Sequence, residues 1–99
     1  MNNYIISIKQ TGKDRVGYFA GVDDEISSTV PAVVWSGNSF QTRRVDTEAL
    51  VFTEIKSNAK ILRGKTNMKS YLYRILEQLP YLPIEISEIK IELLSEVEG

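Results

Sequence analysis

The sequence contains no cysteine and no histidine. Without cysteine, a chain has no disulfides, thiolate metal sites or cysteine nucleophiles. Histidine is the usual general base near neutral pH and the commonest metal ligand, so its absence removes most hydrolase and metalloenzyme designs. The glycines Gly12, Gly17 and Gly21 lack the strand–loop–helix context of a phosphate-binding loop. We therefore expect a protein that is not an enzyme and that uses no cofactor and no metal.

Long apolar runs are also missing. The first residues, MNNYIISIK, have neither the basic region nor the apolar run of a signal peptide. No stretch approaches the roughly 18 apolar residues that a membrane-spanning helix needs. The chain has 99 residues, of which 42% are hydrophobic and 25% charged. This size and composition predict one globular domain over residues 1–99, located in the cytoplasm and not bound to a membrane.

The clearest predicted element is an amphipathic helix over residues 66–79. Its apolar residues recur at helical spacing and form one stripe, whereas polar residues fill the opposite side. The stripe consists of Met68, Tyr71, Leu72, Ile75, Leu76 and Leu79. Thr66 or Asn67 can cap the start, and Pro80 ends the helix. Ser57 and Gly64 leave two alternatives open upstream: one helix from about residue 58 to 79, or a short turn followed by the main helix.

Several segments have the alternation typical of β-strands. Residues 4–9 and 15–21 predict a hairpin around Gly12. Residues 32–35 and 49–53 predict further strands, and residues 40–45 form either a short strand or an extended loop. Residues 84–94 predict a closing strand with a bulge near Ser87 and Glu88, although a helix also fits part of this pattern. The predicted fold is α+β: an antiparallel sheet of about four to five strands with the main helix packed on one face.

Two local features have both a functional and a structural interpretation. Asp23, Asp24 and Glu25 suggest a metal site, but the ligand spacing of a calcium loop is missing, so we favour a solvated acidic turn. Trp35 is the only tryptophan. We favour a core position over a ligand platform for it, because large aromatic residues supply much of the buried area in a small domain.

The charge is unevenly distributed along the chain. Residues 41–76 have eight basic residues against three acidic ones, whereas residues 77–99 have six glutamates against Lys90. We favour pairing between the two segments over a bipolar surface. The candidate partner-binding residues all come from the basic segment: Arg43, Arg44, Lys56, Lys60, Arg63, Lys65 and Lys69, with Tyr73 beside them. At helical spacing, Lys56, Lys60 and Arg63 would share one face, and Lys65 and Lys69 a neighbouring one.

The order of short motifs resembles that of small accessory proteins of phages and mobile elements in low-GC Gram-positive bacteria. The motifs are YIISIK, GYFAG, VVW, TEALVFTEIKSNA and EIKIEL. The resemblance implies core positions for Trp35, Ala49, Phe52 and Ala59. It also implies a role in binding, because some of these genes encode inhibitors of host defence, including anti-CRISPR proteins. The chain departs from the pattern in its polar insert between Gly21 and Pro31 and in the arginines before Asp46.

We therefore predict a non-enzymatic protein-binding module, with a host protein as its partner and a host-defence system as its target. The alternative is a nucleic-acid-associated accessory protein that uses the basic residues between positions 43 and 74. Either residues 32–35 or the closing strand could also form an exposed sheet edge, which would allow a homodimer.

Overall fold

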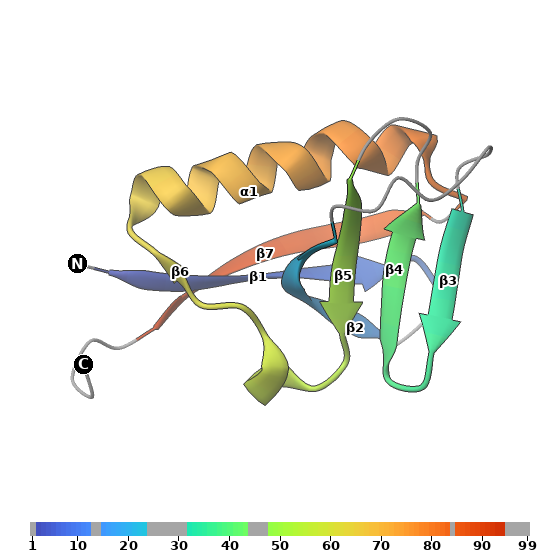
Figure 1. The fold of residues 1–99 in the computed structure, drawn as a ribbon, viewed down its shortest axis with the longest axis horizontal. Helices are drawn as coiled ribbons and strands as arrows, with labels where there is room; N and C mark the ends of the chain where they lie inside the picture. The colour runs from blue at the N-terminus through green and yellow to red at the C-terminus, as the bar shows by residue number, and fades with distance from the viewer. Residues whose placement is uncertain (1, 13–14, 24–31, 44–47, 84, 95–99) are drawn as a thin grey trace.

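The computed structural model describes residues 2–12, 15–23, 32–43, 48–83 and 85–94. It confirms the α+β class, but the antiparallel sheet has seven strands rather than four to five (Figure 1). The strands are β1 (Asn3–Gln10), β2 (Val16–Asp23), β3 (Ala32–Ser36), β4 (Ser39–Arg43), β5 (Ala49–Thr53), β6 (Leu62–Arg63) and β7 (Ile86–Leu94). The helix α1 (Lys65–Gln78) is followed by a single 3₁₀ turn, η2 (Leu79–Tyr81). The prediction missed β6 because two residues are too short to show an alternating pattern.

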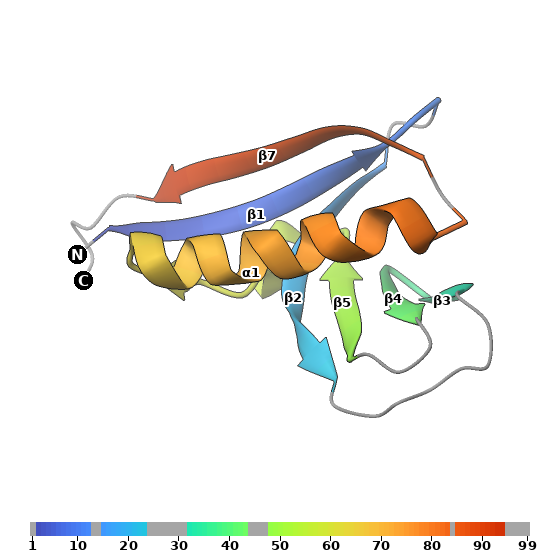
Figure 2. The same cartoon turned by 90° about the horizontal axis from the view of Figure 1, so that it is seen from above.

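The sheet runs in the order β3-β4-β5-β2-β1-β6, and β7 pairs with the remaining side of β1. The predicted hairpin forms, with Ser7 opposite Tyr18 and Lys9 opposite Val16. Viewed from above, α1 lies alongside β1, with β7 beyond β1 on one side and β5 and β4 on the other (Figure 2). The helix therefore covers the middle of the sheet and not its β7 edge.

The strand β1 is buried on both faces. Ile6 and Ile8 are at most 2% exposed and belong to the core under α1. Ile5 and Ser7, on the opposite face, are also buried. Lys56 lies in the 3₁₀ turn η1 (Lys56–Asn58), and its Nζ is 2.7 Å from Oε2 of Glu92, which is opposite Ile5 on β7. This pair spans the second face beside Ile5, as predicted for pairing between the basic and acidic segments.

A row of aromatic rings continues the core into the second half of the sheet. Phe19 meets Phe52 edge-on, with ring centroids 5.8 Å apart, and Phe52 stacks on Phe40 at 5.0 Å. A Cβ at Gly17 would lie only 2.7 Å from the ring of Phe40. Glycine at this position therefore allows the ring to approach the backbone of β2.

The helix α1 begins after Gly64, whose φ of 84° favours glycine. The carbonyl oxygen of Gly64 accepts the first helical bond from Met68, and no side chain caps the start, so the predicted cap at Thr66 or Asn67 is wrong. Upstream of Gly64 the chain forms η1 and β6 rather than helix. The single-helix alternative from residue 58 is therefore also wrong, and the alternative of a short turn followed by the main helix is confirmed.

The closing segment is one bulged strand, as predicted. Lys9 lies opposite Glu88 and Gln10 opposite Ile86, so Ser87 is the extra residue. From Glu88 to Leu94 the pairing with β1 is regular. Side chains at alternate positions therefore point to the same face over this whole stretch.

Candidate interaction surface

Two exposed apolar side chains lie on β7, at one edge of the sheet. Ile91 is 39% exposed and Leu93 is 60% exposed, both on β7. Leu76 on α1 is 43% exposed, and Tyr73, one helical turn before it, is 63% exposed. We call Ile91 and Leu93, together with the outer backbone edge of β7, the edge surface.

The geometry of α1 directs Leu76 toward this edge. Successive residues of an α-helix are about 100° apart, so Arg74 and Leu76 lie on opposite sides of Ile75. Ile75 is fully buried in the core, and Nη1 of Arg74 is 3.3 Å from Oε1 of Glu48, which immediately precedes β5. Leu76 is therefore on the side of the helix that faces away from β5 and toward β7 (Figure 2).

The register of the sheet places Ile91 and Leu93 on the helix-covered side. Ile91 lies opposite Ile6 and Leu93 opposite Tyr4, and directly opposed residues share a face. Ile6 is fully buried by α1, whereas Ile91 is one strand further out, beyond the cover of the helix. The same face of the sheet is thus a core under α1 and an uncovered apolar surface at β7.

The backbone of β7 pairs only with β1 among the described residues. Its outer side therefore presents unpaired N–H and C=O groups, which are a template for another strand. An unpaired edge next to exposed isoleucine and leucine side chains is a surface that another chain can cover with both hydrogen bonds and apolar contacts.

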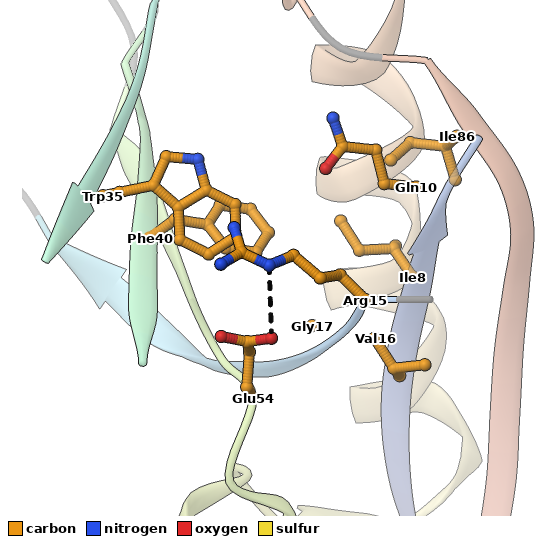
Figure 3. Close-up of a pocket in the computed structure, with 9 residues that line it drawn as sticks. All are labelled: Ile8, Gln10, Arg15, Val16, Gly17, Trp35, Phe40, Glu54 and Ile86. Carbon is orange, nitrogen blue, oxygen red and sulfur yellow. Dashed lines mark ion pairs between the residues drawn. The ribbon is translucent and has the colours of Figure 1, made fainter. Parts of the chain in front are cut away.

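Trp35, on β3, belongs to a second cluster, around a cavity that Ile8 of β1 and Ile86 of β7 also line (Figure 3). The guanidinium carbon of Arg15 lies 4.3 Å from the centroid of the Trp35 ring, and Arg15 Nε is 3.6 Å from Oε2 of Glu54. Trp35 also contacts Phe40, whose ring centroid is 4.6 Å from that of Trp35. Trp35 is 38% exposed, so the prediction of a core position is wrong: the ring covers the end of the aromatic row from outside.

The cavity inside this cluster holds about 10 Å³. A volume of about 10–15 Å³ accommodates a single water, whereas small-molecule sites are typically 300 Å³ or more. Arg15 fills the space that a ligand would need, because it packs on Trp35 and pairs with Glu54 at the same time (Figure 3). We interpret the cluster as a structural contact in which Arg15 and Trp35 cover the end of the core.

The other residues that the resemblance assigned to the core have different outcomes. Ala49 and Phe52 are 1% exposed, which confirms both assignments. Ala59 is half-buried and lies just after η1, outside the core cluster. Its position follows from the chain turning at η1 instead of continuing into a helix.

The predicted basic residues do not form one surface. Lys56 and Lys60 lie upstream of α1, so their predicted helical spacing with Arg63 is wrong. The pKa of Lys56 is raised above its ordinary value of 10.5, chiefly because Glu92 accepts a hydrogen bond from it. Lys60 lies over the ring of Tyr71, with Nζ 5.8 Å from the centroid. Both side chains therefore have partners within the fold.

The remaining candidates divide into two groups. Arg63, Lys65 and Lys69 are exposed near the start of α1, with Lys65 and Lys69 one helical turn apart, as predicted. Arg44 lies outside the described residues, and Arg43 is described only as the last residue of β4. These three exposed cations near the start of α1 form a smaller basic surface than the eight candidate partner-binding residues would have formed together.

The predicted acidic turn falls mostly outside the described residues, which include only Asp23 of its three carboxylates. Oδ2 of Asp23 accepts a hydrogen bond from Nε2 of Gln41 at 2.8 Å, which ties the end of β2 to β4. Within the described ranges, no three acidic side chains gather in an arrangement that could hold a metal ion. The same ranges contain no helix with the length and apolar character to cross a bilayer.

Comparisons with known proteins do not suggest a function, so the function is inferred from the geometry of the chain itself. No family model matches the sequence. Neither curated proteins nor solved structures gave a match. The edge surface is the feature of the described fold that most directly implies a partner, because it combines exposed apolar side chains with an unpaired strand edge.

Proposed function

We propose that this protein is a binding module that acts by attaching to another protein through the edge surface. The observation that carries the proposal is the exposure of Ile91 and Leu93 on a strand that, among the described residues, is paired on one side only. Both residues alternate with polar residues in the manner of a half-buried strand. Instead, the helix leaves them uncovered.

The expected mode of binding is strand addition. An extended segment of the partner would pair with the outer backbone of β7, and its side chains on the helix side would contact Ile91 and Leu93. Backbone hydrogen bonds would supply much of the affinity, and the apolar side chains would supply the specificity. Such an interface requires no catalytic group and no cofactor.

A finer proposal concerns the target. The motif order that resembles accessory proteins of phages and mobile elements supports a host protein as partner, and among such proteins we propose a component of a host-defence system. A binding module could inhibit such a component by covering a surface that the component needs. This proposal rests on the sequence resemblance.

The alternative function is nucleic-acid association through Arg63, Lys65, Lys69 and Tyr73. The observation that favours it is the grouping of three exposed cations near an exposed aromatic ring. Each phosphate contact releases counterions, so binding of this kind weakens steeply as salt increases. Association through an apolar surface changes little over the same range of salt.

The two functions separate in an affinity-capture experiment from host lysate, with and without nuclease. We expect a protein partner that survives nuclease and is lost with Leu93→Glu, which places a charge in the apolar surface. The matched control is Ile61→Glu, which changes an equally exposed isoleucine on the segment before β6. Loss of the partner with nuclease or with Lys65→Glu/Lys69→Glu, while Leu93→Glu retains it, would favour the nucleic-acid alternative.

A further inference from the structure

We propose that the partner of the edge surface is a second copy of this chain, and that two β7 strands pair antiparallel about a two-fold axis at Ile91. This inference rests on the proposed function, because it names the chain that covers the edge. The sequence of β7 is largely complementary to its own reverse around Ile91.

A two-fold axis perpendicular to the sheet makes an edge strand pair with an identical strand running in the opposite direction. With the axis at Ile91, Lys90 of each copy lies opposite Glu92 of the other. On the helix-covered face, Ile91 meets its own copy and Ile89 meets Leu93. Opposite charges on one face and apolar pairs on the other are the cross-strand combinations that stabilise antiparallel sheets.

The neighbouring registers are worse matched. With the axis at Lys90, this residue opposes itself and Glu88 opposes Glu92, so like charges meet. With the axis at Glu92, two glutamates meet at the centre. With the axis at Ile89, Ile91 faces the bulge residue Ser87, and Leu93 lies opposite Glu85, outside the strand. The register at Ile91 is therefore the one that joins apolar pairs on the helix-covered face to Lys90–Glu92 pairs on the other, with Glu88 opposite Leu94 at its ends.

The structure of β7 suits this register. Natural proteins protect free edges with bulges and lysines, and β7 has both, at Ser87 and Lys90. The bulge lies at the start of the strand, however, and residues 88–94 form a regular stretch centred on Ile91. Lys90 is exposed and has a complementary charge two residues away, so in the dimer it would form a pair instead of repelling a partner strand.

Glu92 can take part in the new pair without leaving its present one. Its Oε2 already binds Lys56 within the same chain. A carboxylate has about four acceptor positions on its two oxygens, so it can also accept a hydrogen bond from Lys90 of the second copy. The dimer would therefore join the two existing pairs into a row of alternating charges.

The first test introduces charges at position 91, on the two-fold axis, where each substituted residue faces the same residue of the second copy. Ile91→Lys and Ile91→Glu should each weaken dimerisation at least about tenfold, because two like charges replace an apolar pair. An equimolar mixture of the two variants should regain the dimer, since lysine then faces glutamate. Ile61→Lys is the control for an added surface charge. Sedimentation velocity of the purified proteins over a range of concentrations measures each case.

The second test fixes the register with cysteines, which the natural chain lacks. Ile91→Cys should form a disulfide with its own copy under mild oxidation. Ile89→Cys should not, because the two residues would be about 13 Å apart along the strands, beyond the roughly 7 Å reach of a disulfide. A mixture of Ile89→Cys and Leu93→Cys should cross-link, as these positions face each other.

The outcomes distinguish this inference from the proposed function. A wild-type chain that is monomeric at every concentration, or self-cross-linking at position 89 but not 91, overturns the dimer centred on Ile91. If the chain is monomeric while capture of a foreign protein still depends on Leu93, the proposed function survives without the dimer. If the dimer forms as described but no foreign protein depends on the edge surface, the host target is overturned and the dimer stands.

Discussion

At the scale of single residues, the link between Thr42 and Gln78 fixes the end of α1 to the sheet. Both side chains are at least 95% buried. The hydroxyl of Thr42 donates to Oε1 of Gln78 at 2.9 Å and accepts from the backbone N–H of Leu50 at 3.0 Å. Gln78 in turn donates to the backbone carbonyl of Glu48 at 2.9 Å. These bonds explain why two polar residues occupy core positions.

Thr42→Val tests the value of this link. Valine has nearly the same shape, so the substitution leaves the N–H of Leu50 and Oε1 of Gln78 without the hydroxyl. Buried polar groups that lose their partners typically cost about 1–3 kcal/mol of unfolding free energy. Urea denaturation measures the change. The control is Thr66→Val on the exposed side of α1, and equal losses in both variants would show that the buried bonds contribute nothing.

At the scale of elements, α1 is held by the apolar stripe that its sequence predicts. Ile75→Ala should lower the unfolding free energy by about 2–5 kcal/mol, since Ile75 is fully buried and its truncation leaves a cavity. Leu76→Ala, one residue further along, should cost less than about 1 kcal/mol because its side chain is already 43% exposed. Thermal and chemical denaturation of both variants measure the difference. Equal destabilisation would contradict the orientation of α1.

The elements that sequence predicted are those with a local signal. The helix and the bulge near Ser87 depend on spacing alone, and both are confirmed. Within the stripe, Met68 and Ile75 are buried as predicted, whereas Leu76 is 43% exposed and Gln78, predicted on the polar side, is buried. The sequence left the start of α1 between two alternatives because Ile61 lies in phase with the stripe, and the positive φ of Gly64 interrupts the helix there. The glycine at position 64 therefore sets the start of α1, even though the apolar periodicity continues upstream of it.

The candidate site was less predictable because it depends on contacts between distant segments. Trp35 is outside the core because Arg15, twenty positions earlier, packs on its ring. Lys56 is removed from the basic set because β7 brings Glu92 to it. Ile91 and Leu93 are exposed because α1 lies over β1 and not over β7. None of these partners is specified by the pattern around the residue itself.

At the scale of the whole molecule, pairing of β7 with its own copy would join two sheets into one and place both α1 helices on the same side. The two β1 strands would then be separated by three strand spacings, or about 14 Å. Helices in direct contact are about 8–10 Å apart. The dimer would therefore leave a trough between the helices, with Ile91 and Leu93 in its floor and Lys65 and Lys69 near its rims. A further partner could bind in this trough through side-chain contacts, but it could not add a strand to β7, because the second copy occupies that edge.

Dimerisation also makes the stability of the fold depend on protein concentration. A second copy that binds only the folded chain stabilises it by mass action, so the midpoint of thermal unfolding should increase as the concentration is raised. Ile91→Lys should remove this dependence, and at low concentration its midpoint should approach that of the wild type, because Ile91 is not a core residue. Differential scanning calorimetry over a wide concentration range measures both effects. A wild-type midpoint that stays constant while Ile91→Lys lowers it at every concentration would mean that Ile91 stabilises the single chain, and that the apolar edge of β7 is not where two copies meet.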